Sequence, residues 1–108
     1  MAFVTVGLPT ATIASGASTS NTIKDIGDAY AITIFTPATL TSTGVTLAVE
    51  PSSSGTNFVT LQSGGADVVL PAGRATVISP PAFKQLRIES SSAEGATRTF
   101  SLVSHMAV

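Results

Sequence analysis

The stretch Val45–Glu50, with the sequence VTLAVE, decides the fold class of this chain. Its three large apolar side chains point to one face and the intervening residues point to the other, as in a half-buried β-strand. The turn-forming run Pro51–Thr56 follows, and Asn57–Gln62 returns as a second strand. The stretch 45–62 therefore predicts a β-hairpin.

Short alternating runs bounded by turn residues recur along the rest of the chain. Val, Ile and Thr together account for 33 of the 108 residues, and no window carries a helical apolar stripe. The sequence therefore predicts an all-β fold, an antiparallel β-sandwich of about eight strands. The expected core is Tyr30, Ile32, Ile34, Val45, Leu47, Val49, Phe58, Val77, Leu86, Ile88, Phe100 and Leu102.

A chain of 108 residues fits one domain. We expect an extended N-terminal arm or edge strand over 1–12, the β-sandwich domain over 13–104 and a C-terminal tail over 105–108. The chain has no cysteine, which excludes disulfide staples and thiolate chemistry. Gly64-Gly65 is expected to form a hairpin turn.

The surface is expected to carry little charge. Charged residues make up 10% of the chain, against about 25% in an average soluble domain. Ser and Thr occupy 30 of 108 positions, and the net charge is −1. This balance argues against nucleic-acid binding, and no apolar run is long enough to span a membrane. Low charge is tolerated on a surface that other chains cover, but a Thr-rich β domain with no such contact would have the same composition.

Few residues could support catalysis. His105 is the single histidine and stands four residues from the end, where a chain is a poor support for precise geometry. We therefore expect an exposed tail residue there, no enzyme activity, no catalytic residue and no cofactor.

One acidic pair has two interpretations. Asp25 and Asp28 flank Gly27 and could belong to a calcium loop, or to a polar turn in which the glycine adopts a positive φ. Calcium requires six to eight oxygen ligands, so the polar turn is favoured and no metal site is expected.

The first twenty residues contain no charged side chain. A disordered tail is one interpretation, but five apolar residues make the segment more apolar than such tails usually are. An extended uncharged segment can add to the edge of a neighbouring subunit's sheet. The candidate interaction residues are Phe3, Val4, Val6, Leu8 and Ile13.

Several segments carry a resemblance to a known class of proteins. Val45–Glu50 followed by Ser52–Val59 resembles the "strand, S-x-D-G-T-x-F, strand" hairpin of small tailed-phage virion β-sandwich proteins. Ile13–Ser18, with Ile23–Gly27, is similar to the opening of those proteins. Phe83–Ile88 and Arg98–Val103 resemble their last two strands, so that the likeness covers residues 13–103.

The resemblance implies a jelly-roll-like fold and a structural role. The expected function is that of a capsid decoration (cement) protein in the virion, placed on the phage head as a homotrimer. Its partners would be the major capsid protein and copies of itself. The sequence departs from the pattern at Ser54, where Asp is frequent, which argues against a metal or sugar role for the turn.

An alternative is a carbohydrate- or host-receptor-binding module of a phage tail or fibre, because similar hairpins occur in carbohydrate-binding sandwiches. Such a site would use loop residues such as Tyr30, Asn57 or Gln62. Sugar sites usually stack a ring on an exposed aromatic, and this chain has one Tyr, no Trp and five Phe.

Overall fold

The computed structural model of the chain describes residues 3–24, 26, 29–79 and 81–107. These residues form ten antiparallel strands. No helix in this part of the chain is long and apolar enough to cross a membrane. The strands are β1 (Phe3–Gly7), β2 (Ala11–Ile13), β3 (Ala31–Phe35), β4 (Val45–Glu50), β5 (Val59–Thr60), β6 (Gln62–Ser63), β7 (Ala66–Asp67), β8 (Ala75–Ile78), β9 (Gln85–Ser90) and β10 (Arg98–Ala107).

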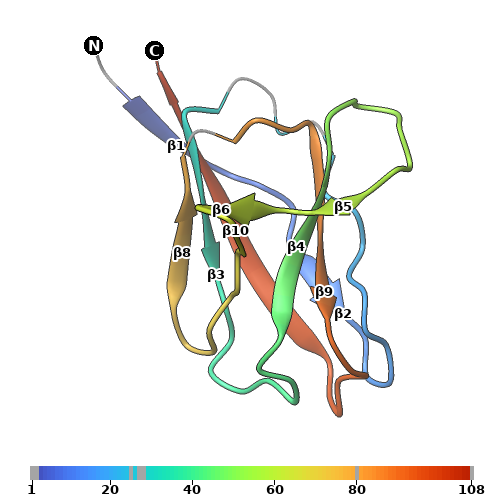
Figure 1. Cartoon of the computed structure of the whole chain (residues 1–108). Coiled ribbons are helices and arrows are strands. Elements are labelled where there is room, and N and C mark those ends of the chain that lie inside the picture. Colours follow the sequence, from blue (N-terminus) through green and yellow to red (C-terminus); the bar gives the residue numbers. More distant parts are fainter. Residues whose placement is uncertain (1–2, 25, 27–28, 80, 108) are drawn as a thin grey trace.

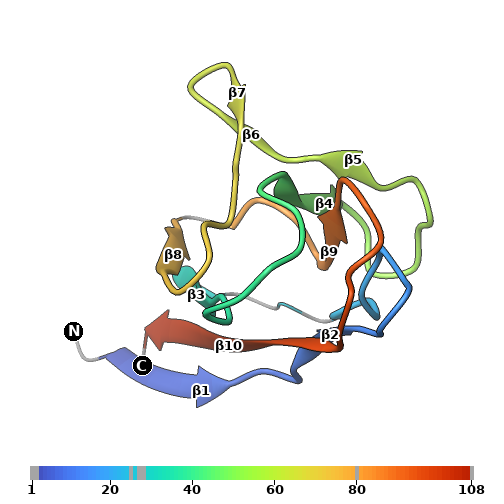
Figure 2. The ribbon, with the colours of Figure 1, turned by 90° about the horizontal axis from the view of Figure 1, so that it is seen from below.

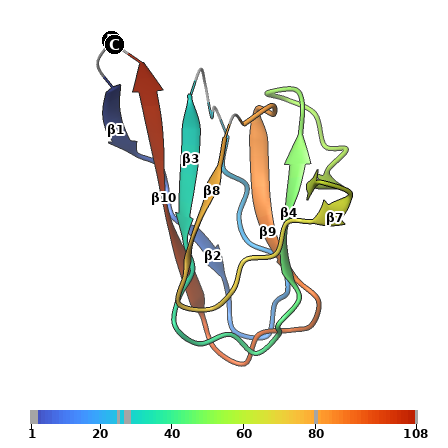
Figure 3. The same ribbon diagram turned by 60° about the vertical axis from the view of Figure 1, so that its left-hand side comes forward.

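The strands make two facing layers, as the sequence predicts for an antiparallel sandwich (Figures 1 and 3). The first sheet has the order β1-β10-β3-β8, and β2 also pairs with β10. The second sheet has the order β5-β4-β9. The first strand of the predicted hairpin, β4, is its centre, since Val45–Glu50 pairs along its whole length with β9 and, at Ala48 and Val49, with β5.

The N-terminal segment crosses from one sheet to the other. β1 and β2 pair with successive parts of β10, on either side of Pro9, which has no N–H to donate. The chain then turns at Gly16, whose φ is 84°. From there it runs beside β9, where the Ser20 N–H donates to Ile88 O at 2.9 Å and the Ile23 N–H to Leu86 O at 2.8 Å.

A short hairpin, β6–β7, projects from the edge of the second sheet (Figure 2). Gly64 and Gly65 form its turn with φ values of 63° and 83°, so the predicted hairpin turn is confirmed. At its base the Val68 N–H donates to Leu61 O at 3.0 Å, and the Leu70 N–H then donates to Val45 O of β4 at 2.8 Å.

The core fills the space between the sheets. Nine of the twelve expected core residues are buried, and six further buried residues complete the cluster: Ala11, Ile13, Ile23, Ile26, Leu70 and Phe83. Three expectations were wrong. Tyr30 is 58% exposed because it stands just before β3, and Val77 is 60% exposed because it lies on the outer face of an edge strand. Phe58 is half-buried, with the Arg87 guanidinium 4.5 Å above its ring.

Candidate interaction surface

Ionisable side chains do not gather into a metal site in the described part of the chain: no group of three or more His, Asp or Glu residues could hold an ion there. Asp25, Gly27 and Asp28, the proposed polar turn, lie outside the described residues.

Glu94 is buried and holds two loops together. The backbone N–H groups of Thr41 and Ser42 donate to its carboxylate at 2.8 and 3.3 Å, and the Ser90 hydroxyl donates at 2.7 Å. The Arg98 guanidinium donates at 2.9 Å. Burial raises the pKa of Glu94, but these hydrogen bonds outweigh burial and lower the pKa to about 2. A carboxylate satisfied in this way is a structural anchor.

Glu50 has a similar role in the turn that follows β4. Its carboxylate accepts hydrogen bonds from the Ser52 N–H at 3.0 Å and the Asn57 N–H at 2.8 Å. The Ser52 N–H lowers the pKa of Glu50, burial opposes this, and the Ser52 hydroxyl and the Asn57 N–H lower it further. The Gln85 amide donates to Ser52 O and Gly55 O at 2.9 and 3.0 Å. The polar groups of the turn that carried the family resemblance are therefore bonded to Glu50 and Gln85 of the same chain.

His105 belongs to the sheet. We expected residues 105–108 to form an exposed tail, but β10 continues to Ala107 because β1 supplies backbone partners for its last residues. The imidazole lies between Thr5 and Thr33, with ring nitrogens 3.2 and 3.1 Å from their hydroxyls. Its side chain therefore links three neighbouring strands.

The candidate interaction residues separate into two groups. Val4 and Val6 lie in β1 and are 42% and 43% exposed. Phe3 begins β1, and its side chain lies outside the described part. Leu8 packs against the core and Ile13 is fully buried within it. The strand that we expected to pair with another subunit pairs here with β10 of its own chain.

The outer face of the first sheet has no Asp, Glu, Lys or Arg in its described strands. Phe35 and Val77 are its most prominent apolar side chains, with Phe35 46% exposed. The register places on this face Thr5 and Gly7, Ser101, Val103 and His105, Ala31, Thr33 and Phe35, and Ala75 and Val77. Composition predicts a surface with little charge, and this face agrees with that prediction. The register that gathers these residues was not visible in the sequence.

The outer face of the second sheet differs from it. Arg87 and Glu89 on β9 form an ion pair, with Nε and Oε2 2.9 Å apart, and each is about one-third exposed. Of the two outer faces, that of the first sheet therefore requires less desolvation of charge to be covered.

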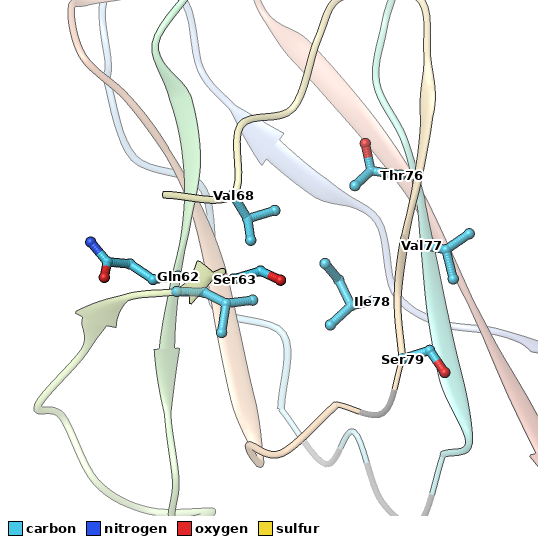
Figure 4. A pocket seen from close by; sticks show the side chains of 8 residues that line it. Gln62, Ser63, Val68, Thr76, Val77, Ile78 and Ser79 are labelled. Carbon is cyan, nitrogen blue, oxygen red and sulfur yellow. The ribbon is translucent and has the colours of Figure 1, made fainter. Parts of the chain in front are cut away.

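A groove of about 330 Å³ opens between β8, at the edge of the first sheet, and the base of the β6–β7 hairpin (Figure 4). β8 forms one wall, and Leu61, β6 and Val68 form the other. Ile78 and Thr76 point toward Val68, while Val77 points away (Figure 4). No lining residue is charged.

Comparisons with known proteins give one structural neighbour of interest. No family model matches the chain, and neither does any curated protein. The crystal structure of the SPBc2 prophage-derived protein YomS is similar, with a TM-score of 0.63 and 10% sequence identity. The alignment covers 97% of this chain and 94% of that one. At this identity the likeness concerns the fold.

Proposed function

We propose that the chain is a structural protein of a phage virion, a decoration (cement) protein that stabilises the head through subunit contacts. It would bind the major capsid protein and copies of itself, without enzyme activity and without a cofactor. The observation that carries the proposal is the uncharged outer face of the first sheet, with Phe35 and Val77 exposed on it.

The composition of this face suits a buried contact. Interface cores are depleted in charge, and covering hydroxyls and apolar groups avoids the large desolvation cost of ions. A standard interface of about 1,600 Å² would bury such a surface, although much of the gain is offset by lost freedom. Many copies on one shell would act together through avidity.

The fold supports the same proposal. The structural neighbour is a prophage-derived protein. We number eight positions along the chain: β1 and β2 together are position 1, residues 19–23 are position 2, and β3, β4, β5, β8, β9 and β10 are positions 3 to 8. The first sheet then has the order 1-8-3-6 and the second sheet the order 2-7-4-5. We infer from this order the jelly-roll winding, in which two Greek keys wrap together.

The test is binding to phage capsids that lack the protein, followed by a count of copies per particle and their position by cryo-electron microscopy. We expect many copies on the head. Phe35→Asp should abolish binding, while Val59→Asp, 63% exposed on the edge of the second sheet, should retain it. No binding by the unmodified chain, or only a few copies at the tail, would contradict the proposal.

A second candidate function is the carbohydrate- or host-receptor-binding module. The observation that favours it is Tyr30, an exposed aromatic able to stack on a sugar ring. Tyr30 adjoins the first sheet, whereas Asn57 and Gln62 belong to the β4–β5 turn and β6. A glycan array with a hit that Tyr30→Ala removes would favour this function over decoration.

A further inference from the structure

The first sheet ends in two strands of similar length. β1 lies at one end of the order β1-β10-β3-β8 and β8 at the other (Figure 3). Neither Phe3–Gly7 nor Ala75–Ser79 contains a charged residue or a proline. Charges and prolines are the usual guards of an edge strand, so both edges are open to pairing.

In each edge strand, alternate residues direct their backbone N–H and C=O groups away from the sheet. The hydrogen bonds at the end of each ladder show which residues these are. The Thr36 N–H donates to Arg74 O at 3.0 Å, so alternation turns the backbone groups of Ala75 and Val77 away from β3. On the other edge the Leu8 N–H donates to Leu102 O at 2.9 Å. By the same alternation, Thr5 and its neighbours two residues away point their backbone groups away from β10.

The side chains between these positions are also complementary. Val4 and Val6 occupy the inner face of β1, and Figures 1 and 2 show that β1 lies to the side of the second sheet, so that the second sheet does not cover it. Beside β8, on the inner face of the same sheet, lies the uncharged groove with Leu61, Val68 and Ile78 in its walls. The chain thus carries two exposed valines on one edge and an apolar groove at the other.

We propose that β1 of one copy pairs antiparallel with β8 of the next copy, and that Val4 and Val6 fill the groove. Pairing five residues with five sets Thr5 opposite Val77, Val6 opposite Thr76 and Val4 opposite Ile78. The partner is a second copy because both complementary edges belong to this chain and neither brings a charge against the other.

The contact is heterologous, since two different edges meet. Repetition closes a ring when the rotation between copies allows it, and otherwise extends a filament. The inference deepens the proposed function and rests on it for the role of the assembly in a virion. The pairing itself is a property of the isolated protein.

The absence of cysteine allows a direct test with the double variant Thr5→Cys/Val77→Cys. Both side chains are exposed, so the core stays intact. Within one copy the two positions are three strand spacings apart, about 14 Å, beyond the roughly 7 Å that a disulfide spans. Any disulfide between these two sites must therefore join two copies.

We expect oxidation of the double variant to give covalent oligomers, as a closed species or a ladder, that each single variant lacks. Thr5→Cys/Val59→Cys is the matched control and should stay uncrosslinked. Light scattering should give an oligomeric mass for the unmodified chain, and Val77→Lys should lower it to that of a monomer while Val59→Lys should not.

A monomeric mass with no crosslinking would overturn the inference. Efficient crosslinking of Val77→Cys or Thr5→Cys alone would also overturn it, because β8 would then pair with β8, or β1 with β1. Capsid binding is measured separately: a monomer that decorates capsids contradicts only this contact, and an oligomer that ignores them contradicts only the proposed function.

Discussion

Arg98 Nε, at the start of β10, lies 2.9 Å from Oε1 of Glu94 in the preceding loop. The Glu94 side chain is fully buried. The same carboxylate accepts backbone N–H bonds from Thr41 and Ser42 in the loop before β4. One side chain thereby joins loops that lie more than fifty residues apart in the sequence.

The Glu94 site should make the free energy of unfolding depend on pH. The folded pKa of Glu94 is about 2 and its ordinary value is 4.5, so Glu94 contributes its full stability above pH 4.5 and loses it as the pH falls toward 2. Glu94→Gln should be less stable at neutral pH and show a weaker decline over this window. Glu50 titrates in the same direction and leaves a residual decline. Thermal unfolding at several pH values measures both, and parallel curves would contradict the assignment.

A side chain at Gly55 should destabilise the turn after β4. A Cβ there would stand 2.6 Å from the carboxyl carbon of Glu50, inside the contacts that hold the turn. Gly55→Ala should cost about 1–3 kcal/mol in unfolding free energy. Gly7→Ala is the control, since a Cβ there meets nothing within 4 Å. Urea denaturation of the two variants gives the comparison, and equal stabilities would refute it.

Two apolar residues that the alternation pattern treats alike should behave differently. Leu47 is fully buried between the sheets, so Leu47→Ala should cost about 2–5 kcal/mol. Val77 is 60% exposed, and Val77→Ala should change stability by less than about 0.5 kcal/mol. Denaturation midpoints decide this, and a large loss at Val77 would mean that its face is packed within the monomer.

The removable part of the N-terminal segment should end at Gly7. Ala11 is fully buried and β2 pairs with β10, so deleting residues 2–12 should open the core. Deleting residues 2–7 removes only β1, whose ladder is with β10. The shorter deletion should keep a cooperative unfolding transition and bind capsids less tightly. Undiminished capsid binding would exclude β1 from the contact.

The β-sandwich was predictable because its signals are local. Alternation along Val45–Glu50 defined a strand with one buried face, and Gly64-Gly65 defined a turn by the positive φ that glycine accepts. Alternation alone was a weaker guide to depth. Tyr30 has the same parity as Ile32 and Ile34 but stands before β3, and Phe83 is buried without lying in any strand.

The site was less predictable than the fold. The sequence indicated a surface with little charge and an apolar N-terminal segment, and the described strands of the first sheet have an uncharged outer face. The sequence could not indicate that Ile13 faces inward or that His105 lies between Thr5 and Thr33, because those contacts join residues far apart in the chain. The burial of Glu94 was missed for the same reason, since two of its donors, the Thr41 and Ser42 N–H groups, come from a distant loop.

The sequence by itself determined the class of fold, because strand alternation is a relation between neighbouring residues. It also determined the chemistry of the surface, which follows from composition. The tertiary structure decided which uncharged residues share one face and which strands become edges. It also decided that β1 ends one sheet while β8 and the groove beside it end the other. Register and sheet order set these relationships, and both depend on backbone pairing between distant segments.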